Sequence, residues 1–130
     1  MCLRDIAPDG TEAVHPGVGN PETPVSIGWG RPSRRALDTE RDKPHLHRPV
    51  HRPDVEDAPA PGEVVAIGIA VGPTGTVFEA GHRLVLEVCA RDPFRAFPFL
   101  HLIPENRRTG GTVTLHTGRE KCWVELPVVS

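Results

Sequence analysis

Apolar and polar positions alternate in several short runs, a pattern that predicts strands rather than helices. Val25–Trp29 alternates apolar and small residues, as a half-buried strand does. In Arg83–Val88 three apolar side chains share one face of the predicted strand, and Arg83 and Glu87 share the other. Cys2–Ile6 predicts a further strand, which runs into a turn rich in Pro, Asp and Gly.

Further stretches along the chain also predict strands. Val64–Val71 is almost entirely apolar, so we expect a strand that is buried on both faces or lies at the centre of a sheet. Thr112–Thr117 alternates apolar residues with threonines and His116, and we expect Cys122, Val124 and Leu126 to form the last inward face. Short strands at this spacing favour an all-β antiparallel sandwich. Periodicity alone leaves jelly-roll, immunoglobulin-like and barrel topologies open.

The segments between these runs predict long irregular loops. Residues 39–61 hold five prolines and three histidines without an apolar period, so we expect a long Pro/His-rich surface loop that is either functional or held by a partner surface. Arg91–Arg108 is a second irregular stretch, where exposed phenylalanines at positions 94, 97 and 99 would mark a contact surface. Ser33–Asp38 predicts one helical turn, with Ser33 as its cap.

Length, composition and charge narrow the class of protein. The 130 residues fit a single domain spanning residues 1–130, and 13 Gly with 15 Pro suit many short strands joined by turns. The net charge of -2 gives no basic excess for nucleic acid, and no apolar run is long enough for a membrane span. Three cysteines without a signal peptide predict free thiols and a cytoplasmic location.

The chain offers no evident catalytic site. It has no Gly-x-Ser-x-Gly elbow, and Ser26, Ser33 and Ser130 lie in strand-like, cap-like and terminal settings. We expect His82 and His116 to be a turn residue and a strand-end residue rather than a catalytic pair. The sequence therefore predicts neither catalytic nor cofactor-binding residues.

The most metal-like pattern is formed by His45, His47 and His51. Three imidazoles at that spacing in a loop can converge on zinc, but the neighbouring prolines keep the segment extended. We therefore expect solvated or docking histidines and no bound metal.

The cysteines and tryptophans are expected to pack inside. Cys89 and Cys122 lie in strand-like runs, where cysteine behaves as a small buried hydrophobe. Core packing is also the expected role of Trp29 and Trp123. With only two tryptophans and no tyrosine, a sugar-binding platform of exposed aromatics has weak support.

A series of local motifs resembles one kind of domain in both content and order. The motifs are Gly28-Trp29-Gly30-Arg31-Pro32-Ser33-Arg34-Arg35-Ala36-Leu37-Asp38, Arg48-Pro49-Val50-His51-Arg52-Pro53-Asp54, Pro61-Gly62-Glu63-Val64-Val65, Val77-Phe78-Glu79-Ala80-Gly81-His82-Arg83-Leu84, His116-Thr117-Gly118-Arg119 and Leu126-Pro127-Val128-Val129. They resemble the C-terminal β-sandwich of X-Pro dipeptidyl-peptidases and cocaine-esterase-like acyl hydrolases, over nearly the whole chain.

The resemblance implies a jelly roll of the galactose-binding-like type and a non-catalytic accessory role. Its partner would be an α/β-hydrolase domain, outside this chain, whose Ser-His-Asp triad hydrolyses an ester or releases an X-Pro dipeptide. The alternatives are a carbohydrate-binding β-sandwich module and an inactive stand-alone remnant.

The resemblance also implies that strands precede Met1 in the family, so we expect an incomplete sandwich, either a fragment or a truncated reading frame. Cys2–Ile6 would then lack a preceding partner strand. An open sheet edge left in this way would favour self-association.

Overall fold

The computed structural model describes residues 1–17, 20–41, 48–89, 93, 113–118 and 122–126. The chain is mostly strand with almost no helix, as the apolar pattern predicts, and its strands pair in antiparallel fashion. It divides into two compact units, Met1–Leu100 and His101–Ser130. All assigned strands and the one short helix of the described residues belong to the first unit.

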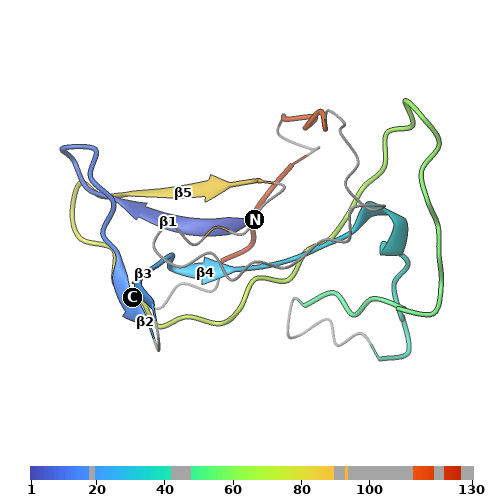
Figure 1. Cartoon of the computed structure of the whole chain (residues 1–130), viewed down its shortest axis with the longest axis horizontal. Helices are drawn as coiled ribbons and strands as arrows, with labels where there is room; N and C mark the ends of the chain where they lie inside the picture. Colours follow the sequence, from blue (N-terminus) through green and yellow to red (C-terminus); the bar gives the residue numbers. More distant parts are fainter. Residues whose placement is uncertain (18–19, 42–47, 90–92, 94–112, 119–121, 127–130) are drawn as a thin grey trace. The chain divides into compact units, whose positions relative to one another are not determined.

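A three-stranded sheet organises the first unit, with β1 (Cys2–Ile6) between β4 (Ser26–Ile27) and β5 (Arg83–Glu87) (Figure 1). Both pairings are antiparallel, and β1 is paired with β5 along its whole length. The strands predicted from alternation at the start of the chain and at Arg83–Val88 are therefore confirmed. The expectation that Cys2–Ile6, without a preceding strand, forms an open sheet edge is wrong, because β1 pairs on both sides with strands that follow it.

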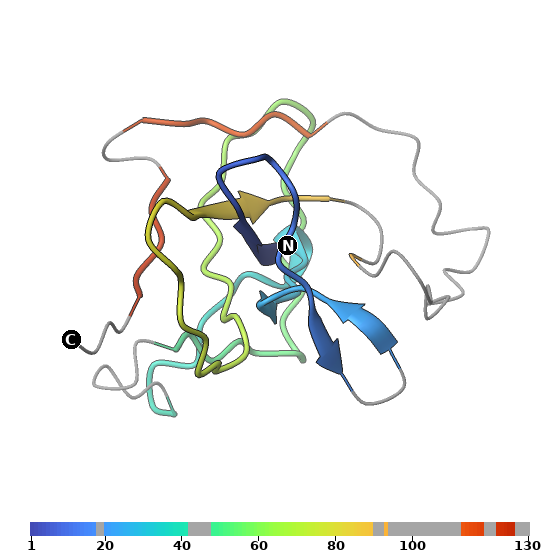
Figure 2. The same cartoon turned by 90° about the vertical axis from the view of Figure 1, so that its left-hand side faces the viewer.

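A tight turn and a hairpin follow β1. Ala7 donates its N–H to the carbonyl of Thr11, and Gly10 takes a φ of 89°, which favours glycine. Thr11 also bonds to the Asp9 carboxylate, and these hydrogen bonds hold the pKa of Asp9 below its ordinary value. The turn leads into the antiparallel pair β2 (His15–Gly17) and β3 (Asn20–Thr23) (Figure 2).

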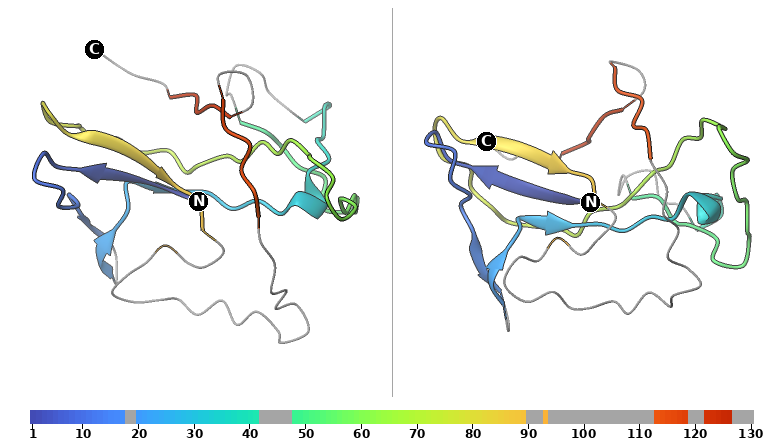
Figure 3. Two further views of the ribbon diagram at one scale, coloured as in Figure 1. Left: turned by 90° about the horizontal axis from the view of Figure 1, so that it is seen from above. Right: turned by 45° about the horizontal axis from the view of Figure 1, so that its top comes forward.

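Residues 67–72 run beside β4 and the residues that follow it (Figure 3). A Cβ atom added to Gly28 would lie 2.5 Å from the carbonyl oxygen of Ala70, and one added to Gly30 would lie 2.6 Å from the side chain of Ile69. The two glycines thus let the two backbones approach closely.

The apolar run Val64–Val71 departs from its prediction. It forms no strand, its residues are half-buried or exposed, and the side chain of Val64 is 66% exposed. Its contact with the neighbouring segment is made through apolar side chains against Gly28 and Gly30 rather than through a hydrogen-bonded ladder. Because no strand is assigned to the run and none of its residues is fully buried, it is not the buried central strand that its composition predicts.

The single helical turn, η1 (Pro32–Arg34), lies where the sequence predicts one but begins a residue earlier. Arg31 occupies the N-cap position without a side-chain cap hydrogen bond, and Pro32 opens the turn. Ser33 lies inside the turn, so its predicted capping role is wrong.

The second unit contributes residues 113–118 and 122–126 to the described structure. No strand is assigned within these two segments, and all of their residues are exposed. The predicted strand at Thr112–Thr117 and the predicted inward face of Cys122, Val124 and Leu126 are therefore not found. An alternating pattern produces burial only where a second layer covers the apolar face, and the described residues of this unit form no such layer.

The centre of the three-stranded sheet combines apolar and charged residues. Cys2, Leu3 and Val25 are buried, and so are Arg4 and Asp5. Among the described residues, no helix is long and apolar enough to cross a membrane. Buried charges require partners, and these partners define the first of three polar features considered below.

Candidate functional site

The guanidinium of Arg4 is held by three acceptors beside the sheet. Its Nη1 lies 2.5 Å from Oε1 of Glu12, its Nε bonds to Glu87, and its Nη2 donates to the carbonyl of Pro93 at 3.0 Å. Burial acts to lower the pKa of Arg4, but the hydrogen bonds to Glu12 and Glu87 outweigh it and raise the pKa. Arg4 therefore stays positively charged inside the protein and bonds to three acceptors.

Cys2 belongs to the same face of the sheet. Its thiol lies 3.6 Å from Oε2 of Glu87, and the residue is completely buried. Burial is the main cause that raises the pKa of the Cys2 thiol to about 11, with a contribution from the negative charge of Glu87. A thiol in this state is neutral near neutral pH and is a poor nucleophile.

Asp5 projects from the opposite face of β1 and meets a histidine. Its carboxylate lies 2.9 Å from Nδ1 of His82, and its side chain is 3% exposed. A carboxylate in this position fixes the orientation of the imidazole ring, as in many acid–base sites. Among the described residues, no serine or cysteine is hydrogen-bonded to His82.

The second feature ties the segment around η1 to the proline-rich loop. We call it the arginine clasp: Arg34 and Arg35 on one side, and Glu56, Asp57 and Glu63 on the other. Arg34 bonds to Glu56 at 3.0 Å, and Arg35 bonds to Asp57 at 2.7 Å and lies 3.9 Å from Glu63. The side chains of these acidic partners are between 45% and 64% exposed, so solvent weakens each ion pair.

Backbone hydrogen bonds reinforce the arginine clasp. Asp57 donates its N–H to the carbonyl of Ser33 at 2.8 Å, and Arg52 donates to Ala36 at 2.9 Å. Asp38 donates to the carbonyl of Val50 at 2.8 Å. The described part of the loop is therefore fastened along its length to the segment that follows η1, even though it forms no regular element there.

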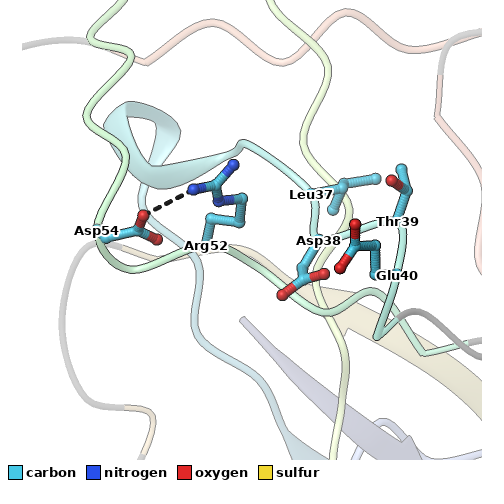
Figure 4. Close-up of a pocket in the computed structure, with 6 residues that line it drawn as sticks. All are labelled: Leu37, Asp38, Thr39, Glu40, Arg52 and Asp54. Carbon is cyan, nitrogen blue, oxygen red and sulfur yellow. Dashed lines mark hydrogen bonds and ion pairs between the residues drawn. The ribbon is translucent and has the colours of Figure 1, made fainter.

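The third feature is a polar hollow next to the arginine clasp (Figure 4). Residues 37–40 line one end of it, and Arg52 and Asp54 line the other. Arg52 and Asp54 form an ion pair of 2.8 Å, which raises the pKa of Arg52 and lowers that of Asp54. The carboxylates of Asp38 and Glu40 give the hollow an acidic excess, which suits a cationic group better than an anion.

The structure places the candidate nucleophiles apart from any catalytic partner. Ser26 is buried and donates its hydroxyl to the carbonyl of Gly72, and Ser33 lies half-buried in η1. Ser130 lies outside the described residues. His116 is exposed in the second unit. Within the described part of the chain, neither serine bonds to a histidine.

Of the three histidines in the metal-like pattern, only His51 lies in the described residues, since His45 and His47 fall in the segment 42–47. His51 is half-buried, and its Nε2 lies 2.7 Å from the carbonyl oxygen of Gly68. A backbone carbonyl thus occupies one of its two ring nitrogens. No group of three or more potential ligands gathers for a metal ion in the part of the chain that is described.

Several residues expected in the core are instead exposed. Trp29 is 62% exposed and Trp123 is 69% exposed, so their predicted core packing is wrong. Cys122 is exposed as well, whereas Cys89 is half-buried. These predictions inferred burial from residue type alone. Tryptophan and cysteine also occur on the surface of a protein, at places where it contacts another molecule. Phe94, Phe97 and Phe99 lie outside the described residues.

Sequence reasoning missed the acidic partners of Arg4 and the ion pairs of the arginine clasp. One signal was available, because Arg4 and Asp5 are charged residues inside a short apolar strand and had to be paired if that strand was central. The partners of these two residues are Glu12, His82 and Glu87, which lie elsewhere in the sequence. No local sequence pattern identifies them as partners.

Comparison with protein-family models identifies a match. The family model described as the X-Pro dipeptidyl-peptidase C-terminal non-catalytic domain matches residues 1–122. Neither the curated proteins nor the solved structures include a match to this chain.

Proposed function

The chain belongs to the family of X-Pro dipeptidyl-peptidase C-terminal non-catalytic domains, and from this membership we propose that it is an accessory domain that packs on an α/β-hydrolase catalytic domain. A non-catalytic C-terminal domain implies a catalytic domain in the parent enzyme. The single observation that carries the proposal is the match over residues 1–122.

The proposed architecture is a jelly-roll sandwich of the galactose-binding-like type, formed by residues 1–130 as one domain. The antiparallel sheet β4-β1-β5 and the near absence of helix support this architecture. Residues 39–61 would be its long Pro/His-rich loop. The arginine clasp would keep the later part of that loop in one position against the partner domain.

The proposed role is mechanical and positional rather than chemical. The charged groups of Arg4, Asp5 and His82 bond to one another or to neighbours, which suits a scaffold that supports a catalytic domain or walls its substrate pocket. The catalytic serine, histidine and aspartate would lie in the partner domain, which hydrolyses an ester or releases an X-Pro dipeptide. The three free cysteines support a cytoplasmic location.

A second candidate function is carbohydrate binding by the β-sandwich. The exposure of Trp29 and Trp123 favours it, because exposed aromatic rings stack on sugars. A binding survey with immobilised glycans tests this candidate, and Trp29→Ala and Trp123→Ala show whether either ring takes part. An inactive stand-alone protein and self-association through an open sheet edge are the remaining alternatives.

Two measurements test the accessory role. The purified chain alone should turn over neither p-nitrophenyl esters nor X-Pro-anilides, because the described serines lack a catalytic histidine. When the chain is mixed with the α/β-hydrolase domain of an X-Pro dipeptidyl-peptidase, the two should co-elute and the melting temperature of the catalytic domain should rise. Turnover by the chain alone that disappears in Ser33→Ala would overturn the proposal.

A further inference from the structure

Two cysteine side chains lie on the same face of the three-stranded sheet. Cys2 is the first residue of β1, and it pairs with Glu87, the last residue of β5; Figure 1 shows the start of β1 beside the end of β5. Cys89 comes two residues after Glu87. Side chains two positions apart along an extended backbone point to the same side, so Cys89 lies diagonally across from Cys2.

The electrostatics of the Cys2 thiol agree with this placement. Burial is the main cause that raises the pKa of Cys2, and the negative charge of an ionised Cys89 is a further cause. Charges more than about 10 Å apart interact weakly in salt solution, so the two sulfur atoms must be closer than that. The strand register and the electrostatics therefore both place the thiols of Cys2 and Cys89 near each other.

The two thiols differ in their access to solvent. Cys2 is completely buried, whereas Cys89 is half-buried. A small dissolved oxidant therefore reaches the sulfur of Cys89 before that of Cys2. The third thiol, that of Cys122, is exposed and belongs to the second unit.

We propose that Cys2 and Cys89 form a redox modification site, at which a hydroperoxide oxidises Cys89 and Cys2 then joins it in a reversible intramolecular disulfide. The disulfide ties the first residue of β1 to the chain just after β5, so it fastens together the two strands with the longest pairing in the sheet. The proposal does not depend on the accessory role.

The geometry allows the bridge after a small movement of Cys89. Diagonal neighbours on an antiparallel pair lie about 7–8 Å apart, and the Cα atoms of a disulfide are usually no more than about 6.8 Å apart. β5 ends at Glu87, so the hydrogen-bonded ladder with β1 does not hold Cys89. The chain after the strand can therefore approach Cys2 while the strands stay paired.

The chemistry consists of two balanced steps. In the first, the sulfur of Cys89 attacks the hydroperoxide; an S–O bond forms, the O–O bond breaks, and the thiol proton leaves with the departing oxygen as an alcohol or water. In the second, the sulfur of Cys2 attacks the sulfenic acid on Cys89; the S–S bond forms, the S–O bond breaks, and the proton of Cys2 leaves with the hydroxide as water. Two thiols are oxidised by two electrons, and one hydroperoxide is reduced.

The surroundings of Cys2 make the second step the slower one. A buried thiol that is neutral near neutral pH is a poor nucleophile, so the sulfenic acid on Cys89 persists long enough to be trapped. Bridging removes the contact of 3.6 Å between the Cys2 thiol and Glu87. Glu87 keeps its ion pair with Arg4, so the bridge leaves that buried charge with its partner.

Peptide mapping of the full chain tests the bridge. The chain carries Cys122→Ser, so that the exposed thiol takes no part. After treatment with hydrogen peroxide and digestion by trypsin without reductant, Cys2 and Cys89 lie on separate peptides that end at Arg4 and Arg91. We expect these two peptides to be linked within one chain and to separate again with dithiothreitol. Linked peptides found only between chains, or no link while Cys89 passes on to sulfinic acid, would overturn the proposal.

Two matched variants in the same background test the order of the steps. In Cys2→Ser, Cys89 should still form a sulfenic acid, which dimedone traps, but no bridge can follow. In Cys89→Ser, the buried Cys2 should stay a thiol under the same treatment. If Cys2 is oxidised as fast in Cys89→Ser as Cys89 is in Cys2→Ser, the assigned order is wrong.

Thermal unfolding shows whether the bridge belongs to the folded chain. A disulfide that closes the long loop from Cys2 to Cys89 restricts the unfolded chain, so the oxidised Cys122→Ser protein should melt at a higher temperature than the reduced one. Treated Cys89→Ser in the same background is the control, and its melting temperature should not change. A bridge that lowers the melting temperature would show that it forms in unfolded chains, which contradicts the proposed site.

Discussion

At the scale of single residues, Arg4 shows how one buried charge constrains a small sheet. Its side chain is 6% exposed, and its two carboxylate partners come from the turn after β1 and from β5. A buried charge with partners is tolerated, whereas removing one partner leaves the others unpaired in a medium that solvates them poorly. Arg4 therefore contributes to stability through its contacts with Glu12 and Glu87.

Arg4→Ala tests this dependence. We expect it to lower the free energy of unfolding by about 3–5 kcal/mol, because the carboxylates of Glu12 and Glu87 would lose their cation. Urea denaturation followed by circular dichroism measures the loss. The matched control is Arg52→Ala, which breaks the solvent-exposed ion pair with Asp54 and should lower the free energy of unfolding far less. Equal losses in the two variants would contradict the importance of the Arg4 contacts.

The buried Cys2 thiol predicts a loss of stability in alkaline solution. Its pKa is raised by burial from 9.0 to about 11, so the folded chain holds this proton more tightly than the unfolded chain. The contribution is complete below the unfolded pKa and is lost as the pH rises through the folded pKa. The free energy of unfolding lost in this way between about pH 9 and pH 11 is roughly 2–3 kcal/mol.

Denaturation curves at several alkaline pH values check this prediction. Cys2→Ala removes the titrating group, so the free energy of unfolding of this variant should fall less steeply over the same pH range. Cys122→Ala serves as control, because that thiol is exposed. An identical pH dependence in wild type and Cys2→Ala would show that another group causes the alkaline loss.

At the scale of elements, the alternation of apolar and polar residues predicted strands correctly where the two faces of the sheet differ in their surroundings. It succeeded at Cys2–Ile6 and Arg83–Val88, which pair with each other, and at the centre of Val25–Trp29. It failed at Val64–Val71, because that run contacts its neighbour through side chains and two glycines. Composition shows that a run is apolar. Whether the run becomes a strand depends on a neighbouring backbone with which it can form a ladder of hydrogen bonds.

The candidate site was less predictable than the strands. Prolines indicated a loop before Pro61, but nothing local indicated that Arg34 and Arg35 would bind its acidic residues. Ion pairs between residues separated by about twenty positions follow from the path of the chain, which the sequence pattern does not give. The charged partners of Arg4 and Asp5 in β1 could not be predicted, for the same reason.

Gly28→Ala tests the close approach between β4 and residues 67–72. The added methyl group would lie 2.5 Å from the carbonyl oxygen of Ala70, a backbone atom that cannot move aside without shifting the segment. We expect a loss of roughly 1–3 kcal/mol in the free energy of unfolding. The control is Gly75→Ala, where nothing lies within 4 Å of the added atom. Its stability should equal or slightly exceed that of wild type, and the reverse order would contradict the packing described.

At the scale of the whole molecule, stability has to come from burial and polar contacts within the chain. Few large apolar side chains are buried among the described residues, and many are exposed. A structural metal would be one way to compensate for a small core. The described residues gather no metal-binding group, and a backbone carbonyl already occupies one ring nitrogen of His51.

We therefore expect a chelator to leave the melting temperature unchanged. Treatment with EDTA followed by calorimetry measures this, and metal analysis of the purified protein provides an independent check. A structural zinc ion contributes on the order of 10 kcal/mol in small domains, so its removal would be unmistakable. A stoichiometric metal that is lost in His51→Ala would contradict the prediction.

The central position of β1 has a consequence for the order of events during synthesis. Within β1, Cys2 pairs with Ile27 of β4 and with Glu87 of β5, so the second partner strand comes much later in the chain than the first. The ribosome must therefore release the chain through β5 before β1 can gain its second neighbour, and closing so long a loop is slow. Until then Cys2, Leu3 and Arg4 are open to chaperones, to oxidants and to neighbouring nascent chains. The yield of folded protein should thus depend on translation speed and growth temperature more strongly than the stability of the finished sheet does.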